Sequence, residues 1–208
     1  MPVNFEEIRK RLDIRIHALI RPRFGDFCYT DAEFSIIKKA VEDFRKIGAE
    51  GVVFGVLKPD GTLNMEQMKE LMEAAGDMSV TLHRAFDVCV DPLETMEQTI
   101  SLGIDTILTS GQRNTCLQGA ELLKELQDKS KGRITIQAGS GVSAEVIRKL
   151  YPLTGIKAYH MTGKRVIDSE MKFRKKGVNM GLPMFSEYEI WRTDIENVRA
   201  AKKVLEEL

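Results

Sequence analysis

The sequence predicts an α/β protein of the (β/α) TIM-barrel type, with about six visible strand–helix units and an incomplete N-terminal part. Two observations predict this fold. Short apolar stretches alternate with helix-forming stretches along the chain, which is typical of a parallel sheet covered by helices. In addition, Gly48, Gly103 and Gly155 each precede an apolar strand that ends at a glycine turn, and they lie 55 and 52 positions apart. This spacing fits two strand–helix units per repeat.

Seven segments carry signals for the start or the end of a helix. Asp91, Pro92 and Glu94, for example, combine a capping side chain, a first-turn proline and a capping-box carboxylate. The predicted helices lie near Asn4, from Asp31 to Gly48, from Asn64 to Gly76, from Asp91 to Gly103, from about Asn114 to Lys131, from Ser143 to about Tyr151 and Pro152, and from Thr193 onward.

Strand character is confined to short segments between these helices. The predicted strands cover residues 14–22, 50–57, 79–86, 104–111, 133–139 and 156–163. A closed eight-stranded barrel takes about 250 residues, so 208 residues with six strands leave part of the wall unaccounted for. Either the barrel is open or its wall is completed from elsewhere. We expect a single domain over residues 1–208.

Composition argues against several classes of partner. The 31 basic and 31 acidic side chains give a net charge of zero, which offers no long-range attraction to nucleic acid or an anionic membrane. No apolar run is long enough for a transmembrane helix, and the first residues lack the apolar region of a signal peptide. The three cysteines do not suit a disulfide framework. We therefore expect a cytoplasmic protein without nucleic-acid or membrane partners.

All three histidines, His17, His83 and His160, fall inside predicted strands. In the third strand, His83 shares a face with Thr81, opposite two apolar residues. Because the outer face of a barrel strand packs on helices, the polar face is expected to line the interior. We assign His83, together with Asp87, as the candidate catalytic pair for proton transfer. The alternative is that these histidines are polar core residues with hydrogen-bond partners of their own.

Charged residues follow the first and the third predicted strand, at the end where barrel enzymes build their sites. Arg21, Arg23 and Asp26 lie at or just beyond the end of the first strand, and Arg84 and Asp87 lie at or just beyond the end of the third. Guanidinium groups bind carboxylates and phosphates in a bidentate manner, which favours an anionic ligand. In the alternative interpretation, an arginine pairs with Asp26 or Asp87 and only joins loops.

Two turns near the last strands have the composition of phosphate-binding loops. Gly139, Ser140 and Gly141 lead into a helix that Ser143 caps, and Lys164 follows the final strand. Phosphate sites in barrels often use these loops together with a helix N-terminus. Glycine-rich turns also serve tight packing alone. The candidate ligand-binding residues are therefore Arg21, Arg23, Asp26, Arg84, His17, Gly139, Ser140, Gly141, His160 and Lys164.

The sequence predicts no defined set of metal ligands. Cu(I) prefers thiolate and thioether ligands. Met65, Met68 and Met72 lie at helical spacing, and this pattern favours a buried stripe. Cys28 is the only thiol near the predicted mouth of the barrel. No lysine at the end of a core strand clearly suits a Schiff base, which argues against a class I aldolase.

Five segments, IRPRFGDF, GVVFGVL, TLHRAFD, TSGQ and SEYEIWRTDIENVRAAKKVL, stand in this order along the chain. In this combination they resemble the CutC family, the so-called copper homeostasis proteins. The resemblance covers nearly the whole sequence. It implies a TIM-barrel fold, a cytoplasmic location, a role in copper handling and a tendency to oligomerise. It attaches no firm enzymatic reaction.

Two departures from the family pattern bear on function. The family normally begins with a strand, a helix and a second strand that do not occur in this sequence. Cysteines put forward as copper ligands in some members fall in that part. In addition, the turn at Ala138, Gly139, Ser140 and Gly141 is usually richer in glycine, and the serine adds a hydroxyl.

Two functional hypotheses follow. In the first, which rests on the resemblance, the protein is a cytoplasmic copper homeostasis protein that binds Cu(I) or supports copper tolerance. In the second, it is a TIM-barrel enzyme or sensor for a small anionic metabolite, a phosphate or a carboxylate, held by the Arg/His/Asp cluster at the barrel mouth. An incomplete barrel exposes strand edges and core, so we also expect a homo-oligomer, a dimer or higher.

Overall fold

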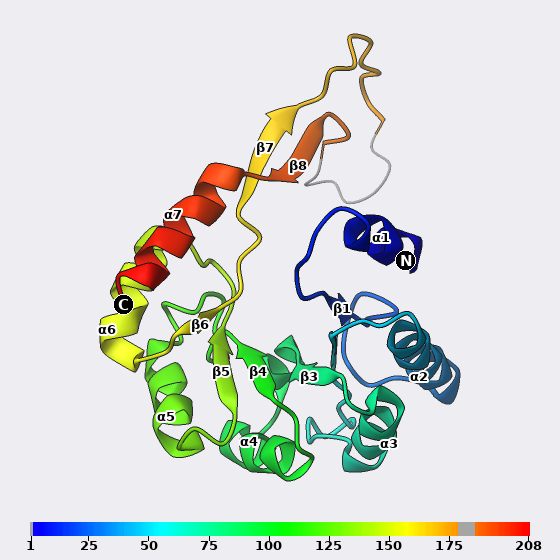
Figure 1. The fold of residues 1–208 in the computed structure, drawn as a ribbon, viewed down its shortest axis with the longest axis vertical. Coiled ribbons are helices and arrows are strands. Elements are labelled where there is room, and N and C mark those ends of the chain that lie inside the picture. The colour runs from blue at the N-terminus through cyan, green and yellow to red at the C-terminus, as the bar shows by residue number, and fades with distance from the viewer. Residues whose placement is uncertain (1, 179–185) are drawn as a thin grey trace.

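A computed structural model describes residues 2–178 and 186–208 of the chain. Its centre is a curved parallel sheet of six strands in the order β1 to β6, with helices α2 to α6 along its outer side (Figure 1). The prediction of an incomplete (β/α) barrel is confirmed, and each strand lies inside its predicted range. The strands are β1 (His17–Leu19), β2 (Gly51–Phe54), β3 (Ser79–Leu82), β4 (Thr106–Thr109), β5 (Thr135–Ala138) and β6 (Ala158–Tyr159).

The helices follow the capping signals of the sequence. Asn64, Asp91 and Ser143 each accept a hydrogen bond from a first-turn N–H group, as predicted. None of the helices among residues 2–178 and 186–208 has the length and apolar character needed to cross a membrane. The helices are α1 (Pro2–Arg9), α2 (Asp31–Lys46), α3 (Met65–Ala75), α4 (Pro92–Ser101), α5 (Ala120–Ser130), α6 (Ala144–Thr154) and α7 (Ile195–Glu206), with a 3₁₀ turn η1 at Arg84–Val88.

Two helices are capped one residue away from the predicted position. Thr30 caps α2 and forms a capping box with Glu33, in which each side chain accepts from the backbone N–H of the other residue. Asp194, rather than Thr193, caps α7, and its carboxylate accepts from the N–H of Glu196. At the start of each of these two helices, two adjacent residues have side chains that can cap, so the backbone conformation decides which of the two is the cap.

Two helices of the second half differ more from the prediction. Helix α5 starts at Ala120 rather than near Asn114, because the preceding loop is closed by contact between Gly111 and Gly119. A Cβ atom on Gly111 would lie only 2.3 Å from the carbonyl oxygen of Gly119. Helix α6 continues through Pro152. Since this proline lies in the last turn, the loss of its N–H costs only one helical hydrogen bond.

The hydrophobic core lies between the sheet and the helices that cover it. In β5, Ile136 and Ala138 are buried, whereas Thr135 and Gln137 are more exposed. The apolar face of this strand is therefore turned to the helices and the polar face to the inside of the curved sheet, as predicted. Burial of each large apolar side chain in such a core stabilises the fold by about 1.5–3 kcal/mol.

An antiparallel hairpin that the sequence analysis did not predict projects beyond the sheet (Figure 1). Its strands are β7 (Lys164–Asp168) and β8 (Glu189–Thr193), with Val166 opposite Trp191. Helix α7 follows β8 and packs against α6, where Ala201 and Val204 join Ile147 in a small apolar cluster. The C-terminal part of the chain thereby lies beside the last strands of the barrel.

Both edge strands of the six-stranded sheet have a single neighbour within the described residues. β1 pairs with β2, and β6 pairs with β5. Large apolar side chains are exposed close to β1, including Leu19 at 64% and Phe24 at 89%. The curved sheet is thus an open part of a barrel wall, and the edge at β1 is flanked by apolar surface.

Candidate functional site

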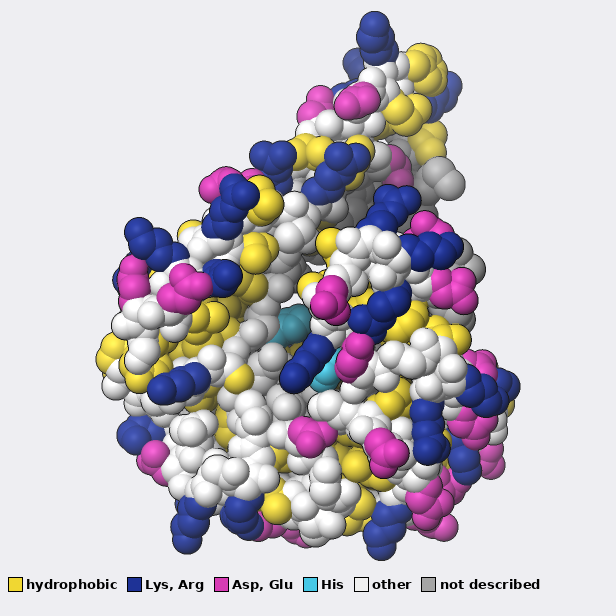
Figure 2. Space-filling view, in the orientation of Figure 1, with side chains coloured by type: hydrophobic (Ala, Val, Ile, Leu, Met, Phe, Trp, Pro, Cys, Tyr) yellow, Lys and Arg dark blue, Asp and Glu magenta, His cyan; other side chains and the backbone are white. Residues whose placement is uncertain are grey.

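The candidate site lies at the carboxyl ends of the strands, where the loops after β3, β4, β5 and β6 meet. Figure 2 shows histidine side chains near the centre of one face of the molecule, next to basic and acidic side chains. The chain leaves β3 through His83 and turns at once into η1, which carries Arg84 and Asp87. This tight turn decides where the predicted site residues point.

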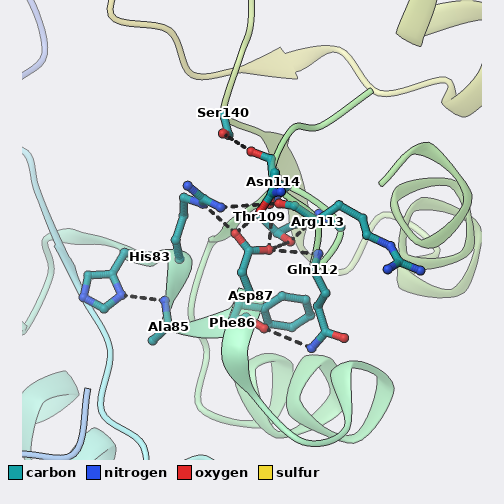
Figure 3. Close-up of polar contacts among 12 residues, drawn as sticks. His83, Ala85, Phe86, Asp87, Thr109, Gln112, Arg113, Asn114 and Ser140 are labelled. Carbon is teal, nitrogen blue, oxygen red and sulfur yellow. Dashed lines mark hydrogen bonds and ion pairs between the residues drawn. The ribbon is translucent and has the colours of Figure 1, made fainter. Parts of the chain in front are cut away.

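His83 and Asp87, the predicted catalytic pair, point to different sides (Figure 3). The Nδ1 atom of His83 accepts a hydrogen bond of 3.2 Å from the N–H of Ala85. The hydrogen-bond partners of Asp87 are all other residues. The two side chains therefore do not form a proton-transfer pair in this conformation.

The Asp87 carboxylate is surrounded by donors. Its side chain is 6% exposed. Five groups lie within hydrogen-bond distance of its two oxygens. Four of them donate to Asp87 whichever way the Ser110 hydroxyl points, which uses its acceptor capacity fully. The pair with Arg84 is one of the two ion pairs that the alternative interpretation named. The five groups are Arg84 Nε at 2.6 Å, Thr109 Oγ1 at 2.5 Å, Ser110 N at 2.9 Å, Ser110 Oγ at 3.0 Å and Gln112 N at 3.1 Å.

Arg84 connects this carboxylate with an open pocket. Its Nη2 atom donates to Ser110 Oγ at 3.0 Å, and its side chain is 43% exposed. The pocket has a volume of about 720 Å³ and lies between the ends of β5 and β6 and the start of α6. Arg84, Ser140, Gly141, His160 and Lys164 all line it, so the structure brings these five predicted residues together.

The loop between β5 and α6 presents backbone donors to this pocket. The N–H groups from Gly141 to Glu145 make no hydrogen bond within the described residues. Ser140 has a φ angle of 72°, in the left-handed region that residues other than glycine rarely occupy. It is held there because its Oγ donates to the carbonyl of Asn114 and its own carbonyl accepts from the N–H of Cys116.

Lys164 contributes less positive charge to the pocket than the sequence indicates. The ammonium group of Lys164 lies 3.4 Å from the ring centroid of Trp191, in a cation–π contact with the hairpin. The side chain of His160 is exposed, and its backbone N–H continues the pairing with Ala138. Arg84 is therefore the main cation that faces this space.

Arg23 is used inside its own loop. Its guanidinium group donates to the carboxylates of Asp26 and Glu33 and to the carbonyls of Phe24, Asp26 and Cys28. These bonds raise the pKa of Arg23 and lower the pKa of Asp26. This is the second ion pair of the alternative interpretation, so Arg23 and Asp26 join the residues after β1 into one unit.

Arg21 and His83 contact the same ring, that of Phe27. The guanidinium carbon of Arg21 lies 4.6 Å from its centroid, and the imidazole centroid of His83 lies 4.7 Å away. Arg21 donates to the carbonyl of Gly25 and forms no ion pair with any residue that the structure describes. Arg21 and His83 thus belong to a second side of the mouth, away from Asp87.

This second side contains two buried polar atoms without a partner among the described residues, His83 Nε2 and the Tyr29 hydroxyl. Burial lowers the pKa of His83 to about 4, and the charge of Arg21 acts in the same direction. The imidazole is neutral at pH 7, and Nε2 carries its proton because Nδ1 accepts from Ala85. Burial also raises the pKa of Tyr29.

His17 does not join the other candidate residues. It is the first residue of β1 and pairs in register with Gly51 at the opposite end of the strands. Its ring covers Gly51 so closely that a Cβ atom there would lie 2.6 Å away. His17 lines a different pocket, together with Arg15, Glu50 and Ser79, and this pocket shares no residue with the one that Arg84 lines.

The cysteines do not form a metal centre in the described part of the chain. Cys28 is half-buried, and Cys89 and Cys116 are buried. Burial raises the pKa of the Cys89 and Cys116 thiols, which disfavours the thiolates that bind soft metals. Among residues 2–178 and 186–208, no group of three His, Cys, Asp or Glu side chains has the arrangement of a metal site.

The structure also reveals site residues that the sequence reasoning missed. Thr109, Ser110 and Gln112 surround Asp87, and Asn197 of α7 lines the pocket. The segment TSGQ at the end of β4 was a signal for the first three, because hydroxyl and amide groups at the carboxyl end of a barrel strand are typical of sites. No local pattern marked Asn197.

Comparison with known proteins gives one family. The model of the CutC family matches residues 3–165. A curated family protein CutC from Bacteroides fragilis (strain YCH46) is 46% identical over 186 residues, which cover 89% of this chain and 74% of that relative. A family protein CutC from Edwardsiella ictaluri (strain 93-146) is 40% identical over 198 residues, 95% of this chain and 78% of that relative.

Solved structures agree with this assignment. The crystal structure of a CutC from Streptococcus agalactiae, described as a copper homeostasis protein, has a TM-score of 0.71 and 27% identity, and the match covers 76% of this chain and 77% of that one. An aldolase, QR15, has a TM-score of 0.55 at 16% identity over 76% of this chain and 73% of its own, which shows the fold alone. The chain belongs to the CutC family.

Proposed function

We propose that the protein binds a small anionic metabolite, a phosphate or a carboxylate, in the pocket beside the start of α6. The observation that carries this proposal is the run of N–H groups from Gly141 to Glu145 that lack an acceptor among the described residues. These groups lie at the positive end of a helix dipole, next to the exposed part of the Arg84 guanidinium. Such an arrangement suits the oxygens of an anion.

Within this proposal, a sensor or carrier is favoured over an enzyme that moves a proton. The acceptor capacity of Asp87 is occupied by at least four donors. The imidazole of His83 is buried and stays neutral near pH 7, since its pKa is about 4. Neither group is therefore poised to exchange a proton at neutral pH.

Titration calorimetry with inorganic phosphate, and separately with acetate, tests the proposal. We expect saturable binding of at least one anion in the millimolar range or tighter, and loss of binding in Arg84→Ala. Arg133→Ala is a matched control, because Arg133 has a similar exposure of 42% and an ion pair with Glu97. Absence of saturable binding by wild-type protein, or equal losses in both variants, contradicts the proposal.

As a second proposal, we carry over to this chain a role in copper handling, because its relative in Streptococcus agalactiae is described as a copper homeostasis protein. In this proposal Cu(I) is the bound ion. The thiol of Cys28 is the one that is not buried. The donor set among the described residues fits Cu(I) poorly, so the anion site has stronger support. Cu(I) binding that survives a competing chelator and is lost in Cys28→Ser would favour copper, and unchanged metal retention in this variant contradicts it.

We further propose that the protein acts in the cytoplasm as a homo-oligomer, a dimer or higher. The single-sided pairing of β1 and the exposure of Leu19 and Phe24 support this, because proteins rarely leave such edges uncovered. A partner chain over this edge would bury them. Sedimentation analysis at micromolar concentration tests the oligomer, and a stable monomer contradicts it. Cell fractionation tests the location.

A further inference from the structure

We propose that Asp87 is a positioning residue of the anion site, which holds Arg84 and the Ser140 turn in their binding geometry through hydrogen bonds across three loops. The inference rests on the proposed function of the pocket. It assigns to Asp87 a role other than the proton transfer that its place beside His83 in the sequence favours. Figure 3 displays the contacts that support it.

The first step links Asp87 with Arg84 and the loop after β4. One carboxylate oxygen accepts from Arg84 Nε and lies 3.0 Å from Ser110 Oγ, and the other accepts from Thr109 Oγ1 and from the N–H groups of Ser110 and Gln112. These donors come from two loops that lie more than twenty positions apart in the sequence. The carboxylate thereby fixes the guanidinium plane of Arg84 against the β4 loop.

The second step continues from this loop to the pocket. The Ser110 hydroxyl lies within hydrogen-bond distance of the carbonyl of Arg113. The next residue, Asn114, accepts from Ser140 Oγ at 2.6 Å, and Cys116 donates its N–H to the carbonyl of Ser140 at 3.0 Å. The loop that Asp87 holds is therefore the loop that holds Ser140.

Backbone conformation supports the same assignment. Gln112 and Ser140 have φ angles of 55° and 72°, and Lys131 is the one other residue besides glycine with a positive φ in the described part of the chain. Gln112 donates its N–H directly to Asp87, and Ser140 is at the end of the chain of contacts. Residues other than glycine in this left-handed region of positive φ need surrounding contacts to hold them there. Since Ser140 precedes the N–H run of Gly141 to Glu145, its conformation sets the direction of those donors.

The proposal predicts that loss of the Asp87 charge weakens anion binding, whereas simple electrostatics predicts that it strengthens anion binding. Removal of a negative charge beside an anion site should strengthen anion binding if the charge acts only through its field. In Asp87→Asn, however, an NH₂ group faces N–H and O–H donors, so the contacts break. We expect phosphate binding to weaken about tenfold or more, which is a change of about 1.4 kcal/mol.

The matched control is Asp26→Asn. Asp26 also pairs with an arginine three positions earlier, Arg23, and the substitution removes the same charge from the other side of the mouth. We expect phosphate affinity to stay within about twofold of the wild-type value. Calorimetry is done well below the melting temperature of each variant, so that a general loss of stability does not change the measured affinity. The ¹⁵N amide resonances of Gly141 and Ser143 should shift in Asp87→Asn but not in Asp26→Asn.

Three outcomes separate this inference from the proposed function. If wild-type protein binds neither phosphate nor acetate, the proposed function is wrong and this inference falls with it; if only acetate binds, acetate replaces phosphate in these comparisons. If wild-type protein binds phosphate and Asp87→Asn binds it equally or more tightly, only the positioning role is wrong. Should Asp87→Asn not fold, Ser110→Ala replaces it, because that change removes the hydroxyl between Asp87, Arg84 and Arg113. Wild-type phosphate affinity in folded Ser110→Ala then overturns the proposal.

Discussion

On the Asp87 side of the mouth, one carboxylate lies within hydrogen-bond distance of five polar groups, whereas on the His83 side two buried polar atoms have no partner among the described residues. Both sides start from the same strand end, and both contain an arginine that pairs with an aspartate three positions later. The difference teaches that the same Arg–Asp spacing can accompany either a fully paired buried carboxylate or buried polar atoms without partners. The Asp87 side is fixed by polar contacts, and the His83 side is held by packing around Phe27.

The largest expected effect is the loss of the Asp87 network. Asp87→Leu leaves Arg84 and the donors of the β4 loop without their acceptor, so we expect the free energy of unfolding to fall by about 3–5 kcal/mol. Urea denaturation measures it. The comparison between the two sides fails if Asp87→Leu is no more destabilising than a conservative change on the His83 side.

The pH dependence of stability probes the His83 side. The folded-state pKa of about 4 lies below the ordinary value of 6.5, so the unfolded chain binds more protons between these values. The contribution of His83 to stability is therefore complete above pH 6.5 and is lost as pH falls toward 4, by roughly 3 kcal/mol. In His83→Asn, whose amide oxygen can still accept from Ala85, this part of the pH dependence should vanish. If the free energy of unfolding changes with pH between 4 and 7 by the same amount in both proteins, the burial of a neutral imidazole is contradicted.

Packing on the His83 side is tested by Gly55→Ala. A Cβ atom at this position would lie 2.9 Å from His83 Nδ1 and 2.7 Å from Leu82 Cδ1. We expect a loss of about 1–3 kcal/mol in the free energy of unfolding, because the core cannot accept the extra methyl group without shifts. Part of that loss should be recovered when the change is combined with His83→Ala. Strict additivity of the two changes would show that the imidazole is not the obstacle.

The smallest effect is expected for Tyr29→Phe. The hydroxyl of Tyr29 has no hydrogen-bond partner among the described residues, so its removal should change the free energy of unfolding by about 1 kcal/mol or less, or stabilise the protein. Tyr159→Phe is the matched control, since the Tyr159 hydroxyl donates to the carbonyl of Ile156 at 2.7 Å. That variant should lose about 1 kcal/mol. A larger loss for Tyr29→Phe would indicate a partner for its hydroxyl.

The fold was predictable because its signals are local. Each strand–helix unit carries its own alternation and caps, and Asn64, Asp91 and Ser143 cap the helices that the sequence assigned to them. The hairpin of β7 and β8 was missed because its strands mix charged and apolar residues and are mostly exposed on both faces. Such a pattern resembles a loop more than a half-buried strand.

The candidate site was predictable only in part. Its position at the carboxyl ends of the strands follows from the fold, and Arg84 and Ser140 do line one pocket. His83 and Asp87 point to different sides because η1 replaces the strand after Leu82, so the two-residue alternation of side chains no longer applies. Apart from Arg84, the partners of Asp87 lie more than twenty positions along the chain, so no local pattern pairs them with this carboxylate, although TSGQ could have marked them as site residues.

The stack of Lys164 on Trp191 gives the protein an intrinsic optical reporter. Trp191 is the single tryptophan of the sequence, and its ring centroid lies 3.4 Å from the ammonium group of a residue that also lines the pocket. A positive charge this close perturbs the electrons of the indole. A ligand that displaces Lys164 should therefore change the emission of the unlabelled chain, so that occupancy of the pocket can be followed by fluorescence in real time.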